Sequence, residues 1–361
     1  MKTIRKKIYA VLISFSLVFL FGCSLEDTAT ETAKVFASEE KLKVHFLDVG
    51  QGDSIFIELP NNETMLIDAG EYMYSSGVQN YIKKLGYSKI NYIVGTHPHS
   101  DHVGGLSDII KNFDFDKIYL PNAVSTTPTY VKLLEAIKVK GKKITRAQKG
   151  VTIINDGNLN ATIIGPVGES YENFNNYSVV IKLTYGANSF LLTGDMETLA
   201  EKELTDNLKA DVLKAGHHGS NTSTSEDFLK KVSPKYAVIS CGKDNDYGHP
   251  HEKVIQRLKN HSVKIYRTDL NGTITFTSDG KNIKTEQEKT SLEDSSSQST
   301  NTQPQTQTQT KYVLNTSSRK IHYSTCPSVD KISTDNRLNT NDYKKAISDG
   351  YAPCKSCKPV A

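Results

Sequence analysis

Three histidines and one aspartate lie within six residues, from His97 to His102, directly after the β-type run at 90–95. Imidazole and carboxylate groups gathered in one turn at the end of a strand are typical donors of a divalent-metal site. His97 and His99 are two residues apart and can face the same ion, whereas Asp101 and His102 can serve a second. A solvated loop with incidental histidines is disfavoured, because the chain of 361 residues has only 10 histidines. The pattern therefore predicts a metal-binding turn between a strand and a helix.

Across residues 41–288 the sequence alternates between β-type runs and helical stretches. Runs such as 42–50 and 272–278 are rich in β-branched and aromatic residues and are bounded by turn-forming residues, as strands are. Apolar residues recur at helical spacing in stretches such as 103–113 and 251–261. Many strands with helices between them require sheets that are covered on their outer faces by helices. We therefore expect one domain of the α/β class, an αββα sandwich, over 41–288.

The first 22 residues have the organisation of a signal peptide, with basic residues at 2–7 before an apolar stretch at 8–21. A membrane-spanning helix needs roughly 20 apolar residues, so an uncleaved anchor helix is the weaker alternative. Residues 20–23 resemble a bacterial lipobox, which implies that Cys23 carries the lipid that holds the protein on a membrane. Residues 23–40 are polar and predict a tether. We expect a lipid-anchored protein on the extracellular face of the cell membrane.

Residues 289–310 are rich in Ser, Thr and Gln and nearly lack large apolar side chains. Such a segment cannot bury enough surface to offset chain entropy, so it predicts a disordered linker before a small module at 311–361. Residues 1–23 carry four basic and no acidic side chains and the tail nine basic and four acidic, which leaves 24–310 with a net charge of −5. An acidic body lacks the basic stripe usual in nucleic-acid-binding domains, although a local patch can exist.

The tail module has its own metal-binding residue types. His322 and Cys326 have three residues between them, Cys354 and Cys357 have two, and 27 residues separate the pairs. One imidazole and three thiolates can form a closed zinc site whose binding energy folds a small module. One disulfide and one thiol are the alternative outside the cell. The segment resembles small Ada-like metal-binding tails of secreted nucleases and hydrolases. Its net charge of +5 suggests contact with DNA or an anionic wall polymer.

The turn at 97–102 has the form HxHxDH, the signature of the metallo-β-lactamase superfamily, and other motifs follow in the order that this resemblance predicts. The resemblance implies that Asp68 is a structural aspartate beside the metal turn and that Asp195 bridges two metal ions. It also implies that one histidine of KAGHHGS is the last ligand of the second ion. His218 is preferred because His218-Gly-Ser resembles phosphodiesterase members, which leaves His217 to contact the substrate or the metal-bound phosphate.

One stretch, 175–180, departs from the superfamily pattern, because it has no histidine where β-lactamases and glyoxalases place one. The resemblance then implies that His97, His99 and Asp195 hold the first ion together with Asn176 or water. Oxygen in place of imidazole shifts the preference from Zn²⁺ toward Mn²⁺ or Mg²⁺. We therefore expect two divalent ions, Zn or Mn, and no β-lactamase activity.

Six ordered motifs between residues 42 and 278 resemble the extracellular hydrolase domain of ComEC-type competence proteins: FLDVGQGDSIFIELP, HPHSDHVGG, NNYSVVIKL, LLTGDM, LKAGHHGSNTS and YGHPH. No multi-helix membrane channel precedes them, so we expect a stand-alone form of that domain. In the first motif, Asp53 either orients a ligand histidine or belongs to an ordinary polar turn. In the last motif, His249 can donate a hydrogen bond to a phosphate oxygen.

Two bound metal ions would lower the pKa of a bridging water from about 15.7 toward neutrality. The resulting hydroxide would attack in line, with Asp101 and Asp195 taking or orienting its proton and His217 contacting the substrate. The favoured function is a metal-dependent phosphodiesterase or nuclease that acts on DNA at the cell surface. One alternative is a phosphodiesterase that acts on cell-wall polymers, similar to phosphorylcholine esterases. Another is a surface binding protein with a vestigial metal site.

Overall fold

A computed structural model describes residues 41–285, 312–324, 326, 328–329, 332–333, 336–355, 357 and 359. The predicted signal peptide, the tether with Cys23, and the linker at 289–310 lie outside the described residues. The chain divides into two compact units between Ser291 and Leu292. The first holds the predicted hydrolase domain and the second holds the tail module.

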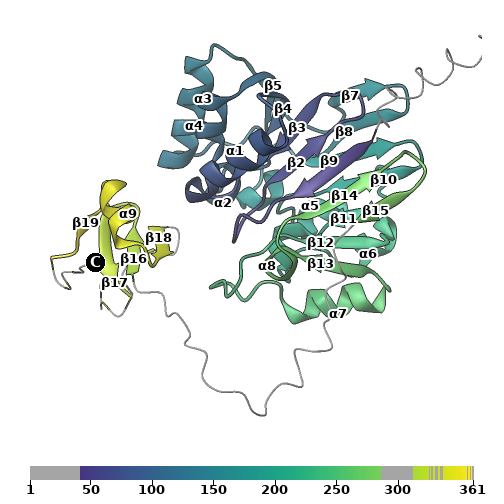
Figure 1. Cartoon of the computed structure of the whole chain (residues 1–361). Helices are drawn as coiled ribbons and strands as arrows, with labels where there is room; N and C mark the ends of the chain where they lie inside the picture. The colour runs from purple at the N-terminus through teal and green to yellow at the C-terminus, as the bar shows by residue number, and fades with distance from the viewer. Residues whose placement is uncertain are drawn as a thin grey trace, which may run out of the picture. The chain divides into compact units, whose positions relative to one another are not determined.

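Two mixed β-sheets form the centre of the first unit (Figure 1). The first sheet has the strand order β15-β14-β1-β2-β3-β4-β5-β6 and the second has β13-β12-β11-β10-β9-β8-β7. The strands of the first sheet are β1 (Leu42–Phe46), β2 (Ile55–Glu58), β3 (Thr64–Ile67), β4 (Lys89–Val94), β5 (Asp114–Leu120), β6 (Ile144–Arg146), β14 (Ile274–Ser278) and β15 (Ile283–Thr285). Those of the second are β7 (Thr152–Asp156), β8 (Leu159–Gly165), β9 (Val180–Tyr185), β10 (Asn188–Leu192), β11 (Val212–Lys214), β12 (Tyr236–Ile239) and β13 (Lys264–Arg267).

Alternation along β2 explains why the first sheet is buried on both faces. Successive strand residues point to opposite sides of a sheet. Ile55 and Ile57 pack into the core between the two sheets, where they meet residues of the second sheet such as Phe190. Phe56 points the other way and joins a second apolar cluster. Because both faces carry apolar side chains, the outer face needs helices to cover it.

Helices lie against the outer faces of both sheets (Figure 1). Helices α1 (Ser75–Lys84), α3 (Leu106–Asn112) and α4 (Pro128–Val139) supply side chains to the apolar cluster that contains Phe56. Helices α6 (Glu226–Val232) and α7 (Glu252–Asn260) lie beside β12 and β13. The shorter helical elements are α2 (Ser100–Val103), α5 (Thr198–Glu203), α8 (Thr268–Asn271), η1 (Tyr72–Tyr74), η2 (Phe174–Tyr177) and η3 (Gly216–Gly219). The αββα sandwich predicted from the sequence is confirmed.

The second unit is built on a four-stranded sheet of order β18-β16-β17-β19. A small core of buried apolar residues, Tyr312, Leu314, Ile321, Ala346 and Tyr351, supports it. Its elements are β16 (Tyr312–Asn315), β17 (Lys320–Tyr323), β18 (Arg337–Thr340), α9 (Tyr343–Ser348) and β19 (Ala352–Pro353).

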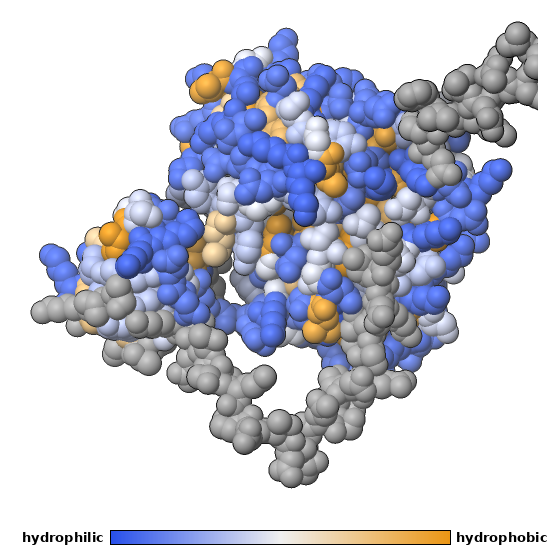
Figure 2. All heavy atoms as spheres, in the orientation of Figure 1, coloured by the Kyte–Doolittle hydropathy of each residue, from blue (hydrophilic) through white to orange (hydrophobic). Residues whose placement is uncertain are grey.

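The surface of the first unit is mostly hydrophilic in the view of Figure 2, with apolar residues scattered singly over it. Val124 and Val139 are strongly exposed, and single exposed apolar side chains of this kind are ordinary for a water-facing surface. Among the described residues, no helix has the length and apolar character that crossing a membrane requires.

The pairing of β1 with β2 is reinforced by a polar cluster around Glu58. Lys43 lies opposite Glu58 in the strand register, and its Nζ is 3.2 Å from Glu58 Oε1. His45 Nε2 lies 3.0 Å from the same oxygen, and the Tyr87 hydroxyl donates to Glu58 Oε2 over 2.7 Å. Burial alone would raise the pKa of Glu58, but the hydrogen bonds from His45 and Tyr87 outweigh it and lower the pKa to about 2.

We expect Glu58→Gln to lower the free energy of unfolding at pH 7 by about 1–2 kcal/mol, because it removes the charge that these partners stabilise. A carboxylate whose folded pKa is lowered stabilises the protein fully above its unfolded value, near 4.5, and loses that effect as the pH falls toward 2. The difference between wild type and variant should therefore shrink between about pH 5 and pH 2. Urea unfolding across this range measures it, and a constant difference would contradict the assignment.

Candidate metal centre

The metal turn is held by Asp68, which follows β3, while the turn itself follows the neighbouring parallel strand β4. Asp68 Oδ1 accepts the backbone N–H of Thr96 over 2.8 Å, and Oδ2 accepts the Thr96 hydroxyl over 2.6 Å. Asp68 Oδ2 also lies 2.8 Å from His102 Nδ1. This contact fixes the ring of His102 and leaves its Nε2 for a ligand. Asp68 therefore lies where a structural aspartate beside the turn was predicted.

Two glycines after the turn let it pack closely against the chain that follows β3. A Cβ on Gly104 would lie 2.3 Å from Ser100 O, and one on Gly105 would lie 2.4 Å from Ala69 O. Neither position has room for a side chain. The sequence predicted one helix over 103–113, but the structure has the short α2 and then α3 from Leu106. The glycine pair lies between these two helices, where the chain packs against Ala69.

Asp195 and His218 come from the second sheet, after β10 and β11, which are parallel neighbours. The backbone N–H of Asp195 donates to Ser178 Oγ over 2.9 Å. His218 Nδ1 lies 2.9 Å from the carbonyl oxygen of Ser240, so its Nε2 also faces the turn. The site is thus assembled at one end of both sheets, where loops of each meet.

Four donor residues form a compact cluster, buried except for the partly exposed Asp101: Asp101, His102, Asp195 and His218, whose ligand atoms all lie within 4.8 Å of one another. Asp195 Oδ2 is 3.2 Å from His102 Nε2 and 3.3 Å from His218 Nε2, and Asp101 Oδ2 is 3.1 Å from the latter. His102 Nε2 and Asp195 Oδ1 are buried and have no hydrogen-bond partner among the described residues. Buried polar groups are normally satisfied, so this donor set fits a divalent cation.

The electrostatics of the cluster favour a cation. Burial by itself would lower the pKa of His102, but the carboxylates of Asp195, Asp101 and Asp68 outweigh it and raise the pKa well above the ordinary value. Several carboxylates thus concentrate negative charge on the same buried space. A bound metal ion offsets that charge in place of protons.

Some, but not all, of the residues predicted to hold the first ion lie close to one another. His97 Nε2 lies 2.9 Å from His99 Nδ1 and 3.9 Å from Asp195 Oδ2, so Asp195 lies between the two donor groups. The side-chain oxygen of Asn176 accepts the backbone N–H of Glu197 over 3.2 Å. Its role as a ligand stays a prediction.

The sequence did not single out the neighbour, Asn175. Its Nδ2 lies 3.3 Å from His217 Nδ1 and also 3.3 Å from Glu197 Oε1. Asn175 Oδ1 is buried and has no partner in the part of the chain that the structure describes. Asn175 and Asn176 both lie in η2, but of these two described residues only Asn175 has a hydrogen bond to His217. Asn175 is therefore a further candidate residue of the site.

His217 is held with its ring near the cluster. Its Nδ1 lies 3.1 Å from Thr222 Oγ1 and 3.3 Å from Glu197 Oε1, and its Nε2 lies 3.9 Å from Asp195 Oδ2. Both His217, with φ 50°, and His218, with φ 53°, adopt the left-handed region that residues with a Cβ rarely visit. Strain of this kind persists where the surroundings over-determine the backbone, as at functional sites.

We expect His217→Gly to be more stable than His217→Ala by about 1 kcal/mol, because both remove the imidazole but only glycine tolerates this φ without strain. Thermal unfolding of the two variants measures the difference. Equal stability would mean that the left-handed backbone at this position stores no strain.

Asp53 lies beside His218 and is paired with a lysine that the sequence analysis missed. Lys214 Nζ is 2.9 Å from Asp53 Oδ2, and both side chains are buried. Asp53 Oδ1 is 3.4 Å from His218 Nδ1. Burial would raise the pKa of Asp53, but Lys214 and His218 outweigh it and lower the pKa. The only feature of the sequence that could have indicated this buried pair was the position of Lys214 in a short apolar strand.

His249 lies at the edge of the centre. Its ring centroid is 5.5 Å from that of His217 and 6.2 Å from that of His218. Burial, with the neighbouring rings of His218 and His217, lowers the pKa of His249 to about 4. A neutral ring at this position can still donate one hydrogen bond to a ligand.

Comparison with known proteins places these residues in a family. Residues 47–243, which include the whole cluster, match the metallo-beta-lactamase superfamily. The chain is 35% identical over 254 residues to ComE operon protein 3 of Bacillus subtilis (strain 168), covering 65% of this chain and 33% of that protein. It is 32% identical over 245 residues to competence protein ComA of Neisseria gonorrhoeae, covering 66% and 32%. It is 31% identical over 261 residues to recombination protein 2 of Haemophilus influenzae, covering 71% and 31%.

The chain spans about a third of the length of each of these relatives. Their similarity is consistent with the ComEC-type competence proteins suggested by the sequence motifs. The matched segment contains both the metal turn and the residues after β10 and β11 that complete it. The chain belongs to the metallo-beta-lactamase superfamily.

Proposed function

We propose that this hydrolase is a metal-dependent phosphodiesterase that cleaves DNA. The observation that carries the proposal is the position of Asp195 between two donor groups, with His102 and His218 on one side and His97 on the other. A carboxylate between two sets of imidazoles fits a pair of divalent ions, and metal pairs are common in enzymes that cleave phosphate esters. Manganese and zinc are the ions proposed.

Divalent ions held there would lower the pKa of a bound water and offset negative charge that develops on the phosphate oxygens. Asp101 Oδ2 lies at the edge of the cluster, and its side chain is 27% exposed, so it can orient the attacking water. His217 is also partly exposed, with Nε2 directed toward Asp195. Asp101 could take the proton that the attacking water loses, and a protonated His217 could donate a proton to the leaving oxygen when the phosphorus–oxygen bond breaks.

DNA as the substrate is supported by the relatives, two of which are named for competence or recombination. The tail adds a net charge of +5, and basic segments attract nucleic acid without reading its sequence. The hydrolase domain over residues 41–288 has equal numbers of acidic and basic side chains, so the tail would supply the long-range attraction and the metal centre would supply the local contacts.

Linear double- and single-stranded DNA, incubated with the purified mature protein and Mn²⁺ or Zn²⁺, tests the proposal. We expect degradation that requires metal and is lost on chelation. A parallel incubation under the same conditions contains a small chromogenic phosphodiester in place of DNA. Turnover of the small ester with intact DNA would contradict DNA as the substrate, and no turnover of either would contradict phosphodiester chemistry.

We also propose that the protein works at the outer surface of the cell membrane, held by lipid on Cys23. The support is the order of basic residues, apolar stretch and cysteine at the N-terminus. Metabolic labelling with a fatty acid should mark the wild type and leave Cys23→Ser unlabelled and released from membranes. Labelling of the variant would contradict the assignment.

A further inference from the structure

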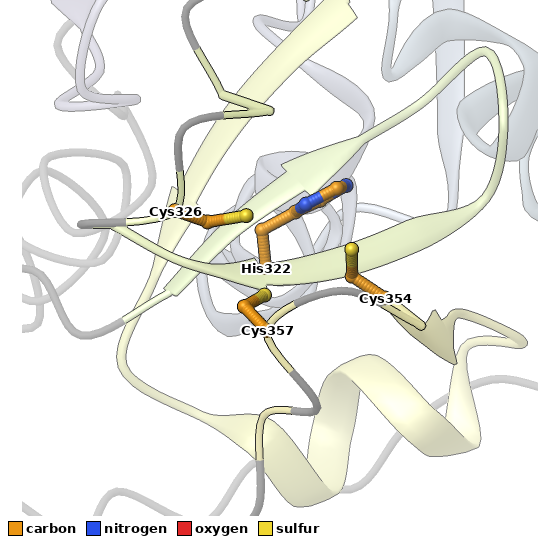
Figure 3. A group of neighbouring side chains, drawn as sticks. All are labelled: His322, Cys326, Cys354 and Cys357. Atoms are coloured by element: carbon orange, nitrogen blue, oxygen red, sulfur yellow. The ribbon is translucent and has the colours of Figure 1, made fainter.

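A second set of metal-binding groups lies in the tail, in the unit that does not contain the hydrolase centre. His322, Cys326, Cys354 and Cys357 present ligand atoms that all lie within 4.8 Å of one another. Figure 3 shows the three sulfur atoms gathered around the imidazole of His322. Cys326, Cys354 and Cys357 form no disulfide in the structure, so a disulfide does not hold this arrangement together.

The backbone brings together residues that are distant in the sequence. His322 lies on β17, and the backbone N–H of Cys326 donates to Tyr323 O over 2.9 Å in the turn that follows. Cys354 comes directly after β19, which pairs in parallel with β17, and its N–H donates to Ile321 O over 2.9 Å. The sheet therefore places one pair of donors beside the other.

The surroundings of the cluster are apolar. Val313, Val329 and Ile332 pack around Cys326 and Cys354. Both ring nitrogens of His322 are buried and have no hydrogen-bond partner among the residues that the structure describes. An imidazole with two unsatisfied nitrogens in an apolar setting costs stability, unless one of them is a ligand.

We propose that this cluster is a closed structural Zn²⁺ site with one nitrogen and three sulfur donors. Four protein donors complete the tetrahedral coordination of zinc and leave no open position for substrate, and soft thiolates favour zinc over magnesium or manganese. The module is small and has a minor apolar core, a size at which a metal commonly replaces missing hydrophobic burial. The ion joins β17 and its following turn to the segment after β19.

Substitution with Co²⁺ distinguishes the tail from the hydrolase centre in the intact chain. The hydrolase cluster has only nitrogen and oxygen donors, so a thiolate-to-cobalt charge-transfer absorption reports the tail alone. A Cys23→Ser background keeps the fifth cysteine out of the measurement. We expect about one equivalent of cobalt to produce this band together with the visible bands of tetrahedral coordination, and Zn²⁺ to displace it.

Variants make the assignment specific. Cys354→Ser and His322→Ala should each lose the tetrahedral spectrum, whereas His322→Cys should retain it with a stronger charge-transfer band, because four thiolates also bind zinc. The control is Cys241→Ser. Cys241 donates to Asp269 in the first unit, and its replacement should leave the band unchanged.

Two results would overturn the proposal. One is the absence of the charge-transfer band in the chain with all tail donors. The other is recovery of a disulfide among the tail cysteines when the protein is isolated and denatured without reductant. In contrast, three tail thiols that resist alkylation in the zinc-loaded protein and become alkylatable after chelation would support it.

Discussion

Asp195→Ala should abolish metal binding by the hydrolase centre and reduce kcat/KM by about a thousandfold or more. The reason is that Asp195 contacts both donor groups, with Oδ2 3.2 Å from His102 Nε2 and 3.9 Å from His97 Nε2. A metal ion contributes several kcal/mol of charge stabilisation in the transition state, and each 1.4 kcal/mol corresponds to about a factor of ten in rate. Metal analysis of the purified chain and steady-state kinetics measure the two effects.

The variant Asp195→Asn keeps the shape of the side chain and removes its charge, so it should lose metal with less change in packing. Asp206→Ala is the matched control, because Asp206 pairs with Lys149 on the surface, away from the cluster. The tail site should keep its ion in all three variants. Full activity in Asp195→Ala with a folded protein would show that the catalytic centre lies elsewhere.

Most of the candidate metal donors could be proposed from the sequence because the turn that carries them is local. His97, His99, Asp101 and His102 lie in one turn after one strand, so no long-range folding is needed to place them together. Asp195 and His218 could be added only through resemblance to a family. Their proximity to the turn depends on the pairing of β10 with β11 in the other sheet, which no local pattern specifies.

Residues that support the ligands were harder to predict. Lys214 appears in the sequence as an ordinary strand lysine, and its burial against Asp53 arises only when the two sheets meet. Asn175 and Asn176 are adjacent and chemically identical, so only the local geometry of η2 shows which of them contacts His217. The break between α2 and α3 could not be predicted from the sequence either. It depends on the tight packing of Gly104 and Gly105 against the chain after β3, which is a tertiary contact.

Replacing Lys214 with Met should lower the free energy of unfolding by about 3–5 kcal/mol, since it leaves the buried carboxylate of Asp53 without its cation. Asp53→Asn should have a comparable cost, because it leaves the buried ammonium, which also donates to the carbonyl oxygen of Ala215, without the negative charge that pairs with it. The double variant should cost less than the sum of the two, because neither charge then remains unpaired. Urea unfolding of the four proteins gives this cycle directly.

A surface pair provides the control for this cycle. Lys235 Nζ lies 2.9 Å from Asp211 Oδ1, the same separation, but the Lys235 side chain is 68% exposed. Lys235→Met should therefore cost less than about 1 kcal/mol. Because Asp53 also contacts His218, Asp53→Asn should weaken metal binding by about 10–100-fold even where the protein remains folded. Additive losses in the cycle, with unchanged metal affinity, would mean that Lys214 and Asp53 neither stabilise each other nor position His218.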